Sequence, residues 1–269
     1  MSIITRISQT SFFTCHEFSY NKIAEAYEPY LGLIRQMFHR YCSGTLEEFM
    51  EECDVYKLQR PVFESYFENG FCERTEQILI DEVEYEQERM RNSIVTMLQK
   101  LSEIRPVVIV LNRFQLASKS TMQLTNRLLQ TKNKNIGIVL GVNDVQSIPE
   151  FAHEEWDAIC ESMDDRNMVY HIGNAGRNME PDVMDYYSDY ESDDGYRKLN
   201  NLVYFLDFDQ ANHHLSKIER RIKFDNFTIS EKKHYQLLLL QIMVSVLQRD
   251  IAKALESCED LEKLQDQEK

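Results

Sequence analysis

The chain has 269 residues, 43% of them hydrophobic, which allows one medium or two small domains with a real core. Its 45 acidic residues against 30 basic ones give a formal net charge of −15. This balance argues against nucleic acid as a partner, because phosphate backbones are bound by clustered Lys and Arg.

The six cysteines stand singly, without Cys-x-x-Cys pairs, so neither a zinc site nor a disulfide framework is predicted. The adjacent His213 and His214 would point to different sides of a helix, which disfavours joint metal ligation. No apolar run approaches the ~20 residues of a bilayer span, and residues 1–20 lack the pattern of an export signal. We therefore expect a cytoplasmic protein with no metal site and no membrane contact.

Strand and helix patterns alternate through the first two-thirds of the chain, and helices alone follow. In chain order the patterns predict a strand at 12–18, a helix at 23–41, short helices within 46–67, a helix at 73–104, a strand at 107–111, a helix at 120–130, a strand at 136–140, a helix at 156–163, a strand at 168–172, and helices at 232–247 and 250–264. Strands separated by helices indicate parallel pairing. The expected fold class is α/β, a layered parallel sheet followed by an α-helical region.

The buried strand predicted at 107–111 is a run of Val, Ile and Leu that stops at Asn112 and Arg113. In a phosphate-binding ATPase the corresponding strand ends in acids that hold Mg²⁺ and polarise the attacking water. An amide lacks the negative charge, and a guanidinium accepts no proton at working pH. We therefore expect no catalytic residues, only degenerate positions of a nucleotide site.

Residues downstream of this strand carry a family resemblance: Gln115, Ala117, Thr121 and Met122. Their spacing resembles the acid-acid-x-Gln-Trp-Ala-Asp-x-x-Ser-Leu segment of STAND ATPases, the signal-transduction ATPases of bacterial LuxR-type activators and cyclase-linked regulators. Leu116 stands where Trp is usual, and Ser118 where Asp is usual. Residues 26–34 also resemble the segment after the family's second strand, and 135–144 its fourth strand. The resemblance implies that Asn143 occupies the place of a polar sensor for the terminal phosphate; the alternative is a strand-terminal turn residue, which needs no function.

The family's phosphate-binding loop, Gly-x-x-x-x-Gly-Lys-Ser/Thr, has no counterpart, because the sequence contains no Gly-Lys dipeptide. Two interpretations follow. Either the chain begins after the first strand and loop of an ATPase, or the protein has discarded nucleotide chemistry. No cofactor is expected for the chain as given. ATP with Mg²⁺ would be expected only if a missing upstream segment exists. The resemblance thus implies an incomplete P-loop-NTPase-like parallel sheet.

The last third contains a weak internal repeat. Its first copy has Asp207, Ala211 and Leu215, and its second, 43 residues later, has Asp250, Ala254 and Cys258. An acid at a helix start and a small residue four positions later resemble a tetratricopeptide-like unit, although 43 residues exceed the usual ~34. Two units rarely bury a solenoid core. The final helix should therefore offer an apolar stripe of Leu255, Cys258 and Leu261 to the preceding helix or to another chain.

These observations predict three parts: a degenerate or truncated STAND-like α/β domain at 1–175, an acidic linker or loop at 176–197, and tetratricopeptide-like helices at 198–269. The function expected first is a non-catalytic, regulatory protein-interaction module of a bacterial signalling protein. It would act through a protein partner or self-association. The alternative is a fragment of a STAND ATPase switch that controls a cyclase or a transcription output and whose nucleotide-binding loop lies upstream.

Overall fold

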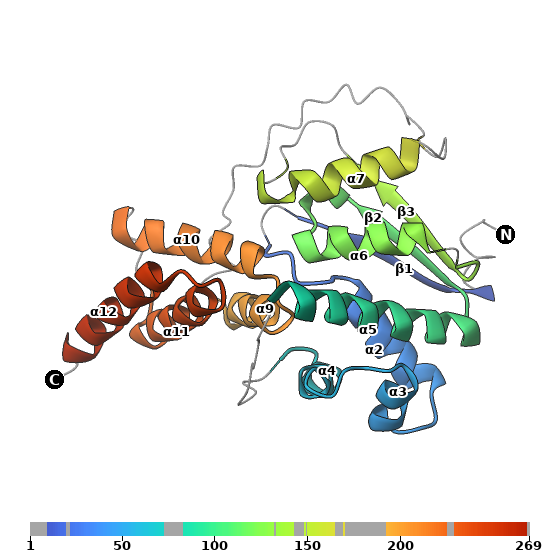
Figure 1. The fold of residues 1–269 in the computed structure, drawn as a ribbon, viewed down its shortest axis with the longest axis horizontal. Helices are drawn as coiled ribbons and strands as arrows, with labels where there is room; N and C mark the ends of the chain where they lie inside the picture. Colours follow the sequence, from blue (N-terminus) through green and yellow to red (C-terminus); the bar gives the residue numbers. More distant parts are fainter. Residues whose placement is uncertain are drawn as a thin grey trace.

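The fold was obtained as a computed structural model, which describes residues 10–19, 22–72, 83–131, 133–142, 148, 150–164, 169, 192–224 and 229–267. The elements in these ranges are β1 (Phe12–Glu17), α2 (Tyr30–Tyr41), α3 (Leu46–Glu52), α4 (Arg60–Asn69), α5 (Val83–Ile104), β2 (Val107–Asn112), η1 (Phe114–Leu116), α6 (Lys119–Gln130), β3 (Ile136–Gly141), η2 (Glu150–Ala152), α7 (His153–Asp164), α9 (Asp193–Tyr204), α10 (Phe208–Phe224), α11 (Glu231–Leu247) and α12 (Ile251–Gln267). The strands, with α5, α6 and α7, lie to the right in Figure 1, and α10, α11 and α12 lie to the left.

The described strands form one parallel sheet in the order β1-β2-β3, as the alternation of strands and helices predicts. In register, Phe12 lies opposite Val107, which lies opposite Ile136. Parallel strands need crossover connections, which α2 to α5 and then α6 supply. Of the further strand predicted at 168–172, only Val169 is described, and it belongs to no regular element.

The helix predicted at 23–41 begins at Tyr30 instead. Pro29 is the reason, since proline lacks an N–H and its ring disfavours helical geometry at the residue before it. Ile23 and Ala26 are nevertheless buried. Their apolar spacing, which predicts a helix, belongs instead to a non-helical segment packed into the core, which ends in a turn where Tyr27 has a φ of 56°.

Hydroxyl side chains set the starts of several helices. Thr45 and Glu48 form a reciprocal capping box at α3. Ser118, Ser192 and Ser230 accept hydrogen bonds from backbone N–H groups in the first turns of α6, α9 and α11. Helices predicted within 46–67 and at 120–130, 156–163 and 232–247 are confirmed with small shifts of their ends. The long helix predicted at 73–104 is described from Val83 onward.

The acidic segment 176–197 is not a linker throughout, because α9 begins within it. The Ser192 hydroxyl accepts from Gly195 N at 2.9 Å, and Asp193 and Asp194 occupy the first turn. Carboxylates are favourable at a helix N-terminus, where backbone N–H groups leave partial positive charge. The last residues of the predicted linker, from Asp193 onward, therefore form the first turn of α9.

The two copies of the predicted repeat fall in two helical hairpins, α9–α10 and α11–α12, whose turns are equivalent. Leu206 and Arg249 both adopt positive φ, 66° and 61°. The next residue in each turn, Asp207 or Asp250, donates its backbone N–H to a carbonyl in the last turn of the preceding helix at 2.8 Å. This is the Schellman arrangement, in which a left-handed residue ends a helix and satisfies its last carbonyls. The two turns are 43 residues apart.

One hydrophobic core runs through the sheet and the first hairpin. The Phe205 ring lies 6.3, 5.8 and 5.5 Å from the rings of Tyr27, Phe63 and Tyr66, measured between centroids. Asn201 accepts from Cys72 N at 2.8 Å. The helical region is therefore packed against the sheet unit. In the described part of the chain, no helix combines the length and apolar character needed to cross a membrane.

Candidate functional site

The predicted nucleotide-site positions Asn112 and Arg113 lie together at the carboxyl edge of the sheet. Asn112 ends β2, in register with Glu17 of β1 and Gly141 of β3. Its Nδ2 donates to Cys15 Sγ at 3.7 Å. A Cβ at Gly141 would stand 2.8 Å from Asn112 Oδ1, so glycine leaves the room that the amide occupies.

Arg113 turns the chain away from the sheet with a φ of 54° and forms an ion pair with Glu17, whose Oε1 lies 3.3 Å from Arg113 Nε. The carboxylate of Glu17 at this edge is thus already matched by a cation. Divalent metal binding would need uncompensated oxygen ligands. The described residues contain no cluster of three or more His, Cys, Asp or Glu side chains that could hold a metal ion.

The other two predicted positions do not join this edge. Gln115 lies in η1 and is almost fully buried, so its amide faces the protein interior. Asn143 lies outside the described residues. Two of the four predicted positions are therefore brought together, and the group formed is an amide beside an ion pair.

A polar junction beneath the sheet edge was missed by reasoning from the sequence. Ser118, which stands where the resemblance leads one to expect Asp, caps α6 and donates from its hydroxyl to the carbonyl of Glu25 at 2.9 Å. The Glu25 carboxylate accepts from Asn201 Nδ2 at 2.8 Å. Burial, and then the neighbouring Glu28, raise the pKa of Glu25 to about 7. The only sequence signal was the cluster of hydroxyl residues at 118–121.

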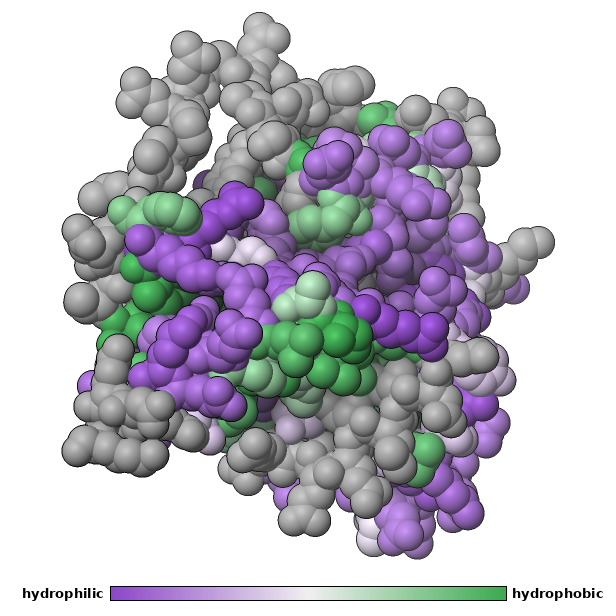
Figure 2. Space-filling model, turned by 60° about the vertical axis from the view of Figure 1, so that its left-hand side comes forward, coloured by the Kyte–Doolittle hydropathy of each residue, from purple (hydrophilic) through white to green (hydrophobic). Residues whose placement is uncertain are grey.

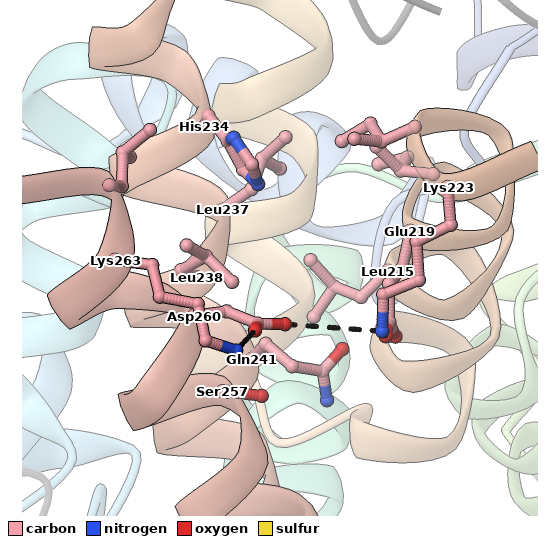
Figure 3. Close-up of a pocket in the computed structure, with 13 residues that line it drawn as sticks. Leu215, Glu219, Lys223, His234, Leu237, Leu238, Gln241, Ser257, Asp260 and Lys263 are labelled. Atoms are coloured by element: carbon pink, nitrogen blue, oxygen red, sulfur yellow. Dashed lines mark hydrogen bonds and ion pairs between the residues drawn. The ribbon is translucent and has the colours of Figure 1, made fainter. Parts of the chain in front are cut away.

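A cavity of about 290 Å³ lies between α10, α11 and α12 (Figure 3). Its aliphatic lining is Leu215, Ile218, Ile222, Leu237, Leu238 and Leu264. At the rim, Lys223 Nζ lies 3.2 Å from Glu256 Oε1 and 3.9 Å from Asp260 Oδ2, and Lys263 Nζ lies 2.8 Å from Asp260 Oδ1. The ion pairs of Lys223 with Glu256 and Asp260 therefore link α10 to α12 across the rim of the cavity.

The predicted stripe on α12 is open on one side. Leu255 is 60% exposed, whereas Cys258 and Leu261 are half-buried. Two further exposed residues, Val246 at 51% and Ile251 at 58%, extend it across the turn. We call the surface made by these helices the end face; it comprises Leu239, Ile242 and Val246 of α11 and Ile251, Leu255 and Cys258 of α12. Figure 2, which turns the side carrying α10 to α12 forward, shows hydrophobic surface there between hydrophilic residues.

Comparison of the chain with protein-family models, curated proteins and solved structures finds no match.

Proposed function

We propose that this protein is a non-catalytic regulatory module that acts by protein–protein contact. In this proposal a STAND-like α/β unit without nucleotide chemistry is joined to tetratricopeptide-like hairpins, which present the contact surface. The setting is a cytosolic bacterial signalling pathway, as the family resemblance implies.

One observation carries the proposal: the ion pair between Arg113 and Glu17 at the carboxyl edge of the sheet. A nucleotide site of this kind needs acids there for Mg²⁺ and for the attacking water. The edge holds a neutral amide, Asn112, and a carboxylate matched by a guanidinium. Such an edge has no uncompensated negative charge with which to bind Mg²⁺ and so position a triphosphate.

The helical hairpins support the second half of the proposal. They place Val246, Ile251 and Leu255 on one exposed surface. Large apolar side chains gathered on a surface are typical of interaction sites, whereas singly scattered ones need no explanation. The contact role is therefore assigned to the end face.

Calorimetric titration of the chain with ATP, with and without Mg²⁺, tests the non-catalytic half. We expect no saturable heat. A Mg²⁺-dependent Kd below ~100 μM, a little over 5 kcal/mol of binding, would contradict the proposal.

Photo-crosslinking in cells tests the contact half. A photoreactive phenylalanine analogue placed at Leu255 should give discrete adducts, and the same analogue at Leu58, another exposed leucine, should give none. Leu58 lies in the connection between α3 and α4, far along the chain from the helical hairpins. Equal labelling at both positions would remove the end face as a contact surface.

The alternative, a fragment of an ATPase switch, is favoured by one feature of the sheet. Within the described residues, the outer edge of β3 pairs with no strand, and Val139 is 53% exposed. A loop-bearing strand could add to this edge. An in-frame Gly-x-x-x-x-Gly-Lys in the nucleotide sequence upstream of Met1 would support the alternative, and a stop codon directly upstream would exclude it.

A further inference from the structure

One side of the first hairpin is covered by the second hairpin, through side chains of α10. Asp209 accepts from Gln248 Nε2 at 3.2 Å. Lys253 Nζ donates to Asn212 Oδ1 at 2.7 Å and to Ser216 Oγ at 3.0 Å. Asp209, Asn212 and Ser216 therefore mark the face of α10 on which the next hairpin of the repeat packs.

The equivalent face of the second hairpin is the end face. The residues 43 positions after Asp209, Asn212 and Ser216 are Ala252, Leu255 and Glu259. All three are exposed, whereas in the first hairpin Asn212 and Ser216 are half-buried and Asp209, at the edge of the face, is exposed. The same comparison on the first helix of each hairpin pairs two identical side chains. Val203 of α9 is fully buried, whereas Val246 of α11 is 51% exposed. The end face thus corresponds in sequence position to the face of the first hairpin that is packed. On the first hairpin, the element that covers this face is another helical hairpin.

A second copy of the chain cannot continue the stack with its own first hairpin. The other side of α9 is already buried against the sheet unit, through Asn201 on Cys72 and Phe205 on Tyr27. The hairpin surface that a second copy brings is its own end face. Two identical faces that meet form a closed, two-fold arrangement, because each patch contacts the same patch on the other copy.

We propose that the end faces of two copies of this chain pack together, so that α11 and α12 of each copy form a four-helix arrangement across a two-fold axis. Such a dimer presupposes the contact role proposed above for the helical region. It names the partner as the chain itself.

Charges at the far end of the hairpin fit this arrangement when the two-fold axis runs along the helices. In that geometry α11 of one copy lies over α12 of the other, and the turns of both copies lie at the same end of the dimer. Residues at similar distances from their own turns therefore face one another. Lys232 and Glu262 lie about 22 Å and about 16 Å from the turn, at 1.5 Å per residue. Both are exposed, and neither has an ion-pair partner among the described residues. Lys232 would therefore reach Glu262 of the partner copy.

Sedimentation equilibrium between ~1 and ~100 μM provides the first test. We expect the wild-type chain to approach twice its 31.9 kDa mass. Leu255→Ser should weaken association at least ~100-fold, because each dimer loses two buried leucines. Leu58→Ser removes an equally exposed leucine elsewhere, 55% against 60%, and should leave the mass unchanged. Circular dichroism establishes that each variant is folded.

A charge exchange provides the second test and does not depend on the apolar variant folding. Lys232→Glu alone and Glu262→Lys alone each place like charges opposite one another twice in a dimer, so each should associate about tenfold more weakly than wild type. An equimolar mixture of the two variants should regain wild-type association, because both pairs become opposite in sign. Lys57→Glu, at an exposed position outside the helical hairpins, is the matched control and should have no effect.

A wild-type chain that remains monomeric at ~100 μM would overturn the dimer. So would unchanged association of Leu255→Ser. A mixture of the charge variants no stronger than either variant alone would overturn the proposed orientation. None of these results bears on the nucleotide titration, and a monomeric chain that still gives adducts with other proteins at Leu255 keeps the proposed function while losing the dimer.

Discussion

The carboxylate of Asp207 accepts a hydrogen bond from the backbone N–H of Ser120 at 3.0 Å, and so joins the first helical hairpin to the start of α6. The same carboxylate accepts from Gln210 N at 3.3 Å, within the first turn of α10. Asp207 is buried, and burial raises its pKa. Its equivalent in the repeat, Asp250, caps α12 by accepting from Lys253 N at 3.1 Å but lies at the surface.

These two aspartates form a matched pair for mutation. Asp250→Ala removes an exposed helix cap and should destabilise the protein by about 1 kcal/mol. Asp207→Ala removes a cap and also leaves the buried N–H of Ser120 without an acceptor, so we expect about 2–4 kcal/mol. Urea unfolding of both variants measures the difference. Equal losses would show that the contact of Asp207 with α6 contributes nothing beyond capping.

Glu25 should make the stability of the protein depend on pH. Its pKa rises from 4.5 to about 7, mainly through burial and then through Glu28. A carboxyl group with a raised folded-state pKa is more stable in its neutral form, so its contribution is present below about pH 4.5 and is lost as pH rises through about 7. The loss attributable to this group is about 3 kcal/mol.

Glu25→Gln isolates this effect, because the amide keeps an acceptor for Asn201 and cannot ionise. We expect the variant to lose much less stability than the wild type between pH 5 and pH 8; the raised pKa values of Glu28 and Asp207 leave a loss that is common to both proteins. Glu28, Lys198 and Asp194 also face the group and remain unchanged in both proteins. Parallel pH profiles for the two proteins would contradict the assignment.

Asn112→Asp combined with Arg113→Asp restores the acids of the family pattern at the end of β2. We expect no ATP binding or hydrolysis from this double variant, because the phosphate-binding loop is absent from the sequence. Calorimetry with ATP and Mg²⁺ measures it beside the wild-type chain. Binding tighter than ~100 μM would mean that the acids alone rebuild a site.

Gly141→Ala should cost about 1 kcal/mol, because its Cβ would come within 2.8 Å of Asn112 Oδ1 and force that side chain to move. In an Asn112→Ala background the same substitution should cost much less. Gly137→Ala, whose Cβ would meet nothing closer than 3.8 Å, is the control and should be neutral or slightly stabilising. Additive effects of the two substitutions in thermal unfolding would show that the contact is not restrictive.

The sequence alone was sufficient for the strands predicted at 12–18, 107–111 and 136–140, their parallel pairing and most helices. The run from Val107 to Leu111 is β-branched and short, and helices on both sides of it exclude a hairpin. The repeat was also readable, because the two turns need the same residues at the same spacing. Such features depend on interactions between residues near one another along the chain. The end of β2 was equally visible, since Asn112 and Arg113 directly follow the strand.

Only the tertiary structure decided how these elements are used. The spacing of Ile23 and Ala26 predicts a helix, yet both lie in a buried non-helical segment, because Pro29 and the packing of the core prevail over local periodicity. Val203 and Val246 occupy equivalent positions in the repeat, and the sequence around them does not say which is covered. Burial depends on contacts with residues distant in the chain, so the pairing of Arg113 with Glu17 and the exposure of Leu255 required the three-dimensional arrangement.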